Sequence, residues 1–120
     1  MLRAMLTPPD VAGTWTAQVA RPSETSLSTL RFTADGRALL ISGGVGAGTW
    51  TPTGPDSFSY RITEPLFDPH GAYIGWVDID QHALGRGDTF TSTGISTVYD
   101  AVDRCAYRAP VDITAHRSDG

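Results

Sequence analysis

The clearest alternation of apolar and polar residues in this chain is Phe58-Ser59-Tyr60-Arg61-Ile62-Thr63-Glu64. Successive side chains of a β-strand point to opposite faces, so this stretch predicts a strand whose even-numbered residues share one face. The same period of two recurs along residues 13–117, and no segment after residue 12 repeats apolar residues at the 3.6-residue period of a helix. The sequence therefore predicts an all-β protein.

Short turn signals separate the alternating runs. Asp35-Gly36 predicts a tight hairpin because both residues tolerate positive φ angles, and Gly94 predicts a break between two strands. About nine strands are expected, near residues 13–21, 26–34, 37–42, 48–53, 58–64, 72–84, 88–94, 95–101 and 105–117. Eight or nine consecutive antiparallel strands are enough to close a single meander β-barrel around one small ligand. An open sandwich is the alternative architecture.

Length and charge limit the organisation and the partners. A chain of 120 residues is one domain, with a lead-in at residues 1–12, a barrel at 13–117 and a frayed tail at 118–120. The net charge of -4 gives no electrostatic reason to bind nucleic acid or an anionic membrane. All basic residues are arginine, so chemistry that needs a lysine Schiff base is excluded.

Cysteine usage and the amino terminus predict a cytoplasmic protein. Cys105 is the one cysteine, so it cannot form an internal disulfide, and we expect it to be a small core residue. The apolar residues at positions 1–6 are too few for the hydrophobic region of a signal peptide. No stretch approaches the roughly 20 apolar residues of a membrane-spanning helix.

Two Gly-x-Trp sequences, Gly13-Thr14-Trp15 and Gly48-Thr49-Trp50, each open an alternating run. The first resembles the entry of lipocalin-like (calycin-type) barrels, and the short chain is most similar to compact bacterial barrels of that type. The resemblance implies that Trp15 plugs one barrel end under a stacked arginine from the last strand, either Arg108 or Arg117. Some barrels of this architecture are cofactor-free cyclases or isomerases of natural-product biosynthesis that act on polyketide-like substrates, whereas others only bind ligands.

The inward face of the predicted strands supplies the candidate site. Glu64 ends its strand beside a proline-bracketed connection at residues 65–71, which is the best lid candidate. Partial desolvation there would raise the pKa of the Glu64 carboxyl towards the range of a general acid or base, with Tyr60 as its catalytic partner. The expected ligand-binding residues, all assigned to inward faces, are Trp50, Phe58, Ile62, Tyr73, Val77, Gln81, Tyr99 and Tyr107.

Three functional hypotheses follow. The first is a cofactor-independent cyclase or isomerase that folds an apolar, polyketide-like molecule inside the barrel, with Glu64 as acid or base. The second is a non-catalytic protein that binds or sequesters such a molecule. The third is a structural dimeric module with a filled interior. An open interior favours the first two hypotheses, and a packed one favours the third.

Other motifs have simpler interpretations. The glycine-rich residues 43–48 precede a strand and not a helix, so a flexible bend is favoured over a phosphate loop. Asp78, Asp80 and His82 share a strand face about 6.8 Å apart, too far to converge on one metal ion, so no metal is expected. Trp76 lies on the same outer face and is a candidate contact of a homodimer.

Overall fold

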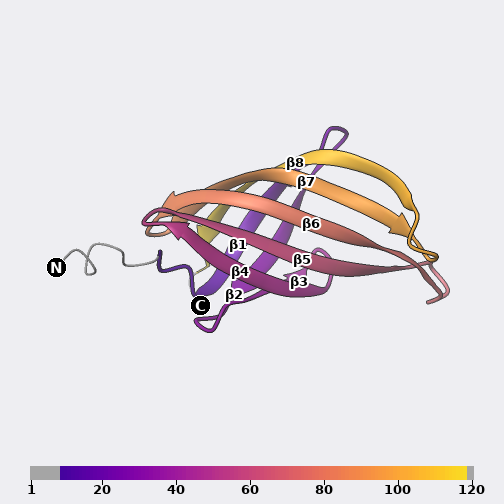
Figure 1. The fold of residues 1–120 in the computed structure, drawn as a ribbon, viewed down its shortest axis with the longest axis horizontal. Coiled ribbons are helices and arrows are strands. Elements are labelled where there is room, and N and C mark those ends of the chain that lie inside the picture. The colour runs from indigo at the N-terminus through magenta and orange to yellow at the C-terminus, as the bar shows by residue number, and fades with distance from the viewer. Residues whose placement is uncertain (1–8, 119–120) are drawn as a thin grey trace.

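The computed structural model describes residues 9–118, which contain eight strands. The strands are β1 (Gly13–Ala20), β2 (Thr25–Phe32), β3 (Arg37–Ser42), β4 (Gly46–Gly54), β5 (Ser57–Phe67), β6 (Tyr73–Arg86), β7 (Thr89–Asp100) and β8 (Cys105–Arg117). Each strand pairs antiparallel with the next, and β8 pairs with β1, so the meander closes into one barrel (Figure 1). The predicted all-β meander barrel is confirmed. No helix in this part of the chain is long and apolar enough to cross a membrane.

The predicted break at Gly94 is wrong, because β7 runs without interruption from Thr89 to Asp100. A Cβ atom at Gly94 would collide with the backbone carbonyl oxygen of Asp80 and approach the side chain of Gln81. The glycine therefore allows a close approach of β6 to β7, and the two expected strands at residues 88–94 and 95–101 are one.

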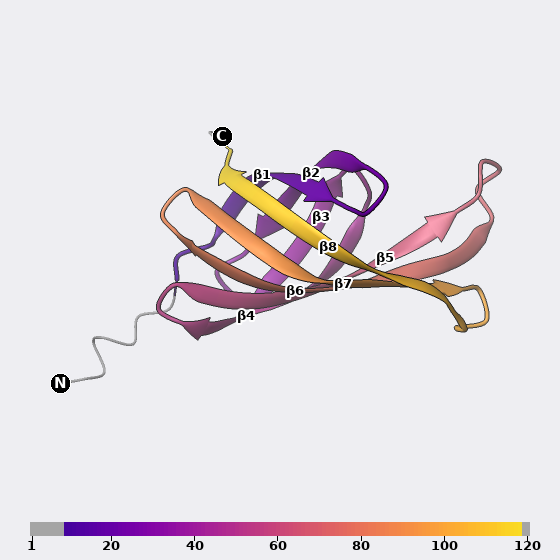
Figure 2. The same ribbon diagram turned by 90° about the horizontal axis from the view of Figure 1, so that it is seen from above.

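Strands β5 to β8 are longer than strands β1 to β4. β4 pairs with β5 only as far as Thr63, and β1 pairs with β8 only from Asp112 onward. The far ends of the four long strands continue beyond the closed barrel as a four-stranded sheet, visible on the right of Figure 2. We call this sheet the extension; it comprises residues 64–67, 73–77, 98–100 and 105–107.

Prolines lie on the free strand edges that this arrangement leaves. Pro65 is in the part of β5 beyond its pairing with β4, and Pro110 is in the part of β8 beyond its pairing with β1. Pro52 lies in β4 beyond its pairing with β3. Because proline has no backbone N–H, these edges are poor templates for pairing with a further strand.

The predicted lid at residues 65–71 is also wrong, because β5 continues to Phe67 and only residues 68–72 form a turn. The Asp68 Oδ1 atom accepts the amide hydrogens of His70 and Ala72 at 2.8 and 2.9 Å. The segment is a tight hairpin at the end of the extension and does not cover the barrel.

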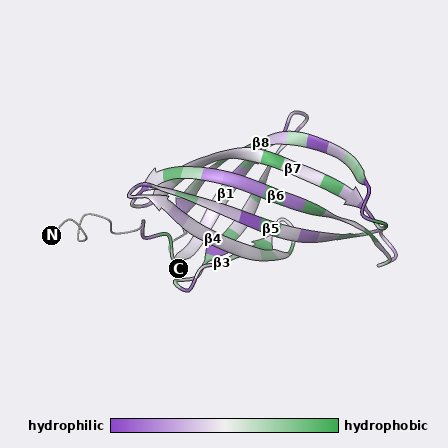
Figure 3. Ribbon diagram, viewed as in Figure 1, coloured by the Kyte–Doolittle hydropathy of each residue, from purple (hydrophilic) through white to green (hydrophobic). Residues whose placement is uncertain are grey.

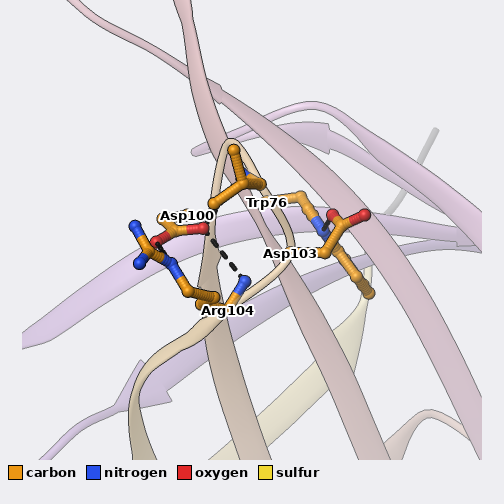
Figure 4. A network of polar contacts seen from close by, with 5 residues as sticks. Trp76, Asp100, Asp103 and Arg104 are labelled. Carbon is orange, nitrogen blue, oxygen red and sulfur yellow. Dashed lines mark hydrogen bonds and ion pairs between the residues drawn. The ribbon is translucent and has the colours of Figure 1, made fainter.

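The same five-residue turn closes two further hairpins. In residues 100–104 the first residue, Asp100, again accepts the amide hydrogens of the third and fifth residues (Figure 4). The fourth residue has a positive φ angle in each turn: 86° at Gly71, 64° at Asp103 and 97° at Gly36 of residues 33–37. Each is a type I turn followed by one residue with a positive φ angle. The two-residue hairpin expected at Asp35-Gly36 would need positive φ angles at both residues, and only Gly36 has one.

The barrel interior is filled at the end where β1 begins. Apolar and polar residues alternate along the strands (Figure 3), and the apolar set turns inward. Aromatic rings, mostly edge to face with centroids 4.8–6.5 Å apart, fill this end: Trp15, Phe32, Trp50, Phe58, Tyr60 and Phe90.

Trp15 is the plug that the Gly-x-Trp resemblance implied. Its side chain is 1% exposed, and its Nε1 atom donates a hydrogen bond to the Val11 carbonyl oxygen at 2.9 Å. The Arg117 guanidinium lies over the indole ring, so Arg117 and not Arg108 is the stacking arginine. Residues 1–8 and 119–120 of the expected lead-in and tail lie outside the described part of the chain.

Candidate functional site at the mouth of the barrel

A small cavity lies inside the other end of the barrel, which we call the mouth. Its volume is about 40 Å³, and it is walled by Val19, Arg21, Ser28, Leu30, Leu40, Gly43, Tyr60, Ile62, Glu64, Ile79, Ser96, Val111 and Ile113. A cavity needs about 10–15 Å³ to hold one water molecule, so this space accepts a small chemical group of about two or three non-hydrogen atoms. The rest of the interior holds packed side chains.

Two larger hollows lie on the outside of the barrel. One of about 610 Å³ lies beside the lead-in, against the core residues of the plugged end, and its charged lining residues include the ion pairs of Arg86 with Asp56 and of Arg117 with Asp88. The other, of about 410 Å³, lies on the outer face of β5 to β8 and contains the paired Arg61 and Asp78. The mouth cavity differs from both because most of its lining residues are on the inner faces of the strands.

Glu64 faces this cavity, so its predicted inward orientation is confirmed. On the inner face of the sheet, Glu64 of β5 begins a row of paired residues that crosses four strands. The other members are Val77 of β6, Val98 of β7 and Tyr107 of β8. Burial of the half-buried carboxyl raises the pKa of Glu64, and the positive charge of Arg21 partly opposes that rise. The structure thus places a carboxyl group with a raised pKa between an apolar row and a small cavity.

The glycine-rich bend packs against Glu64. A Cβ atom at Gly44 would collide with the Glu64 carboxylate, and one at Gly43 would collide with the backbone of Leu27. Both glycines have positive φ angles, 75° at Gly43 and 134° at Gly44. The bend that the sequence predicted therefore covers the carboxyl group, a position that we had expected residues 65–71 to occupy.

Tyr60 and Gln81 lie one layer deeper and use their polar atoms within the chain. The Tyr60 hydroxyl and Ser92 Oγ are 2.8 Å apart, and Ser92 Oγ donates to Gln81 Oε1 at 2.7 Å. Gln81 Nε2 donates to the Val111 carbonyl oxygen at 3.1 Å. Burial raises the pKa of the Tyr60 phenol, and the bond with Ser92 opposes this rise. The pair forms a satisfied buried network behind the cavity.

The remaining inward candidates divide between the cavity and the core. Ile62 forms part of the cavity wall, and Val77 and Tyr107 lie in the row of Glu64. Phe58 and Trp50 belong to the aromatic end, where Trp50 Nε1 donates to the Thr33 carbonyl oxygen at 2.7 Å.

The inward orientation expected for Tyr99 is wrong. Because β7 is unbroken, Tyr99 shares the outer face with Thr89 and Thr91, and its ring stacks on Trp76 at a centroid distance of 4.4 Å. Trp76 Nε1 in turn donates to Asp103 Oδ1 at 2.9 Å (Figure 4). Trp76, the candidate homodimer contact, thus has partners within its own chain.

The inward orientation expected for Tyr73 is wrong for a different reason. The register between β5 and β6 shifts after Leu66, which places Tyr73 opposite Phe67 on the outer face. The two rings contact each other with centroids 6.1 Å apart. Cys105, expected in the core, is exposed. A register shift between β7 and β8 places it opposite Tyr99, which is on the outer face.

The expected metal-ligand candidates lie on the outer face of β6. Arg61 donates to both carboxylate oxygens of Asp78, at 3.0 and 2.7 Å, and these bonds lower the pKa of Asp78. Asp80 and His82 are exposed. Within residues 9–118, no three His, Cys, Asp or Glu side chains are grouped closely enough to hold a metal ion.

The chain was compared with protein-family models, with curated proteins and with solved structures. None of them matches. The closed eight-stranded antiparallel barrel, with its buried Trp15 and stacked Arg117, is compatible with a lipocalin-like architecture.

Sequence reasoning missed several residues at the mouth, among them Leu40, Val111 and Ile113 of the cavity wall. Ser28 has the parity of Leu30 and could have been assigned to the interior by alternation alone. The break expected at Gly94 leaves the face of each residue after it undetermined by the strand before it. Ser96 and Val98 therefore could not be assigned to the inner face from the sequence. Arg21 lies in a turn, where no periodic signal exists.

Proposed function

We propose that the protein binds an apolar small molecule at the mouth of the barrel, with the body of the ligand lying on the inner face of the extension. One observation supports this proposal: the row of Glu64, Val77, Val98 and Tyr107 runs across four strands beyond the points where β4 and β1 stop pairing with them. Tyr107 is 61% exposed, although its row is continuous with the interior. Concave apolar surfaces with a few polar groups are the usual binding places of small molecules.

The cavity volume favours binding at the mouth over full enclosure. The interior space of about 40 Å³ cannot hold a polyketide-like chain, because a drug-sized ligand needs several hundred Å³. The extension supplies the missing surface, since Leu66, Ala109 and the Glu64 row line its inner side and the adjoining barrel wall. Burying each aliphatic side chain under a ligand would contribute about 1.5–3 kcal/mol at most.

A cofactor-independent cyclase or isomerase working at the same mouth is the second candidate. It is favoured by the desolvation that raises the pKa of Glu64, because a raised pKa is the direction that a carboxyl general acid requires. Tyr60 would then support the site from behind through its bond with Ser92, because its hydroxyl is already engaged. If the protein is such an enzyme, Glu64→Gln should bind substrate but lower kcat roughly 10²–10⁴-fold.

Binding is tested with the neutral apolar dye Nile red, whose fluorescence rises in apolar surroundings. Val98→Asp places a charge in the middle of the row and should weaken dye binding by about tenfold or more, equivalent to about 1.4 kcal/mol. Ile95→Asp is the matched control, because Ile95 is three residues away on the outer face of the same strand. Melting temperatures show whether both variants fold.

Two results would contradict the proposal. The first is a wild-type protein that does not bind the dye or any alkyl compound, which would favour the structural module with a filled interior. The second is equal weakening by Val98→Asp and Ile95→Asp, which would place the dye elsewhere.

A further inference from the structure

We infer that the ligand is an amphiphile with a small cationic head, a primary ammonium group, which enters the mouth cavity and contacts the Glu64 carboxylate. This inference rests on the proposed function, because the apolar body of the same ligand must lie on the extension.

The size of the cavity restricts the head group. A space of about 40 Å³ accepts a group of about two or three non-hydrogen atoms, such as an ammonium or a hydroxyl group with the carbon that carries it. A trimethylammonium group has four non-hydrogen atoms and is larger than this space, so we expect it to remain outside. The apolar rows that lead outward from the cavity, through Val77 and Val98, would contact only the tail.

The charges around the cavity favour a cation. Its ionisable lining residues are Arg21, Tyr60 and Glu64. The Arg21 guanidinium donates to Ser26 Oγ at 2.7 Å and lies 4.0 Å from Glu24 Oε2, so a neighbouring carboxylate balances its charge. The Tyr60 phenol is neutral because burial raises its pKa. Glu64 and Glu24 thus share the single positive charge of Arg21, so these three groups together carry one net negative charge beside the cavity.

Glu64 has the chemistry to hold such a head group. Desolvation raises the pKa of its carboxyl, the charge of Arg21 lowers it, and no hydrogen bond from a neighbouring residue contributes. A half-buried carboxylate is only partly solvated, and an ammonium ion that donates to it offsets part of that desolvation cost. The hydroxyl groups of Ser28 and Ser96, in the same lining, can accept the other ammonium hydrogens.

The preference for an ammonium head group should increase with pH. An ammonium ion binds the ionised carboxylate, and burial keeps Glu64 protonated to a higher pH than an exposed glutamate. Affinity for the amine should therefore rise as the pH rises through the pKa of Glu64, while the amine itself remains protonated.

The experiment compares four probes with the same tail by displacement of Nile red: octylamine, octanol, octanoate and octyltrimethylammonium. Wild-type protein should bind octylamine about tenfold or more tightly than the other three. Glu64→Gln should remove that preference and leave octanol binding unchanged. Asp80→Asn is the matched control, because it removes one negative charge from the outer face and should preserve the preference for the amine.

The outcomes separate the two proposals. Equal binding of all four probes by wild type overturns the head-group inference but leaves the proposed binding function intact. Tighter binding of octanoate also overturns it and assigns the head group to Arg21. Equally tight binding of octyltrimethylammonium overturns the insertion of the head into the cavity. Absence of binding by Nile red and by every probe overturns the proposed function itself. The wild-type comparison needs no variant, so a Glu64→Gln protein that fails to fold does not block the test.

Discussion

The guanidinium of Arg117 lies over the indole of Trp15, with Arg117 Cζ 4.4 Å from the ring centroid. The two residues are opposite each other on β8 and β1, the strands whose pairing closes the barrel. Arg117 also donates to the carbonyl oxygens of Ala12 and Asp10, at 2.7 and 2.9 Å. The arginine therefore joins the closing strand, the plug and the lead-in.

Trp15→Ala should lower the free energy of unfolding by about 3–5 kcal/mol, because it leaves a large cavity in the aromatic end. Urea unfolding measures the loss. Trp76→Ala is the control, since Trp76 is only half-buried on the outer face and should cost clearly less. Equal losses would mean that Trp15 does not plug the barrel.

Gly71→Ala should lower the free energy of unfolding by about 1–2 kcal/mol through its positive φ angle. A Cβ atom at this position meets no other atom within 4 Å, so backbone strain is the expected cause. Gly71→Asp should cost less than Gly71→Ala, because aspartate tolerates this conformation better and Asp103 already adopts it in the matching turn. The reverse order in urea unfolding would show that the two turns are not equivalent.

Ser92→Ala should lower the free energy of unfolding by about 2–3 kcal/mol, because it removes a partner from both Tyr60 and Gln81 in a dry interior. The double variant with Tyr60→Phe should cost less than the sum of the single variants, since their interaction is already lost. Ser42→Ala, which removes an exposed bond to Thr29, should change stability by less than about 0.5 kcal/mol. Additive losses would argue against a connected network.

The stability difference between wild type and Glu64→Gln should depend on pH. Burial raises the pKa of Glu64 above its usual value of 4.5, so the folded protein holds this proton more tightly than the unfolded chain does. The stability contributed by protonated Glu64 is fully present below the unfolded pKa and is lost as the pH rises through the folded pKa.

Wild type should therefore lose stability relative to Glu64→Gln as the pH rises above 4.5, and the difference should then become constant. Asp78, whose pKa is lowered by Arg61, changes stability in the opposite direction but equally in both proteins. Urea unfolding across this pH range measures the difference. A relative gain of wild type with rising pH would mean that Glu64 is not desolvated.

The alternation of residues along each strand was sufficient to predict much of the barrel. Phe58, Tyr60, Ile62 and Glu64 face inward as expected, because β5 has no irregularity between them. Tyr73 and Tyr99 were assigned to the wrong face, since one register shift or one false break reverses the parity of everything beyond it. Local sequence does not reveal such a shift, because it depends on the neighbouring strand.

The sequence by itself determined that this chain forms antiparallel strands, which side of most strands is apolar, and that Trp15 and Glu64 face the interior. These properties follow from the two-residue period of a strand and from burial of apolar side chains. Only the tertiary structure decided how far β5 to β8 extend past the closed barrel, how small the cavity at Glu64 is, and that the glycine bend covers it. These features depend on pairing and packing between residues far apart in the chain, which no local pattern encodes.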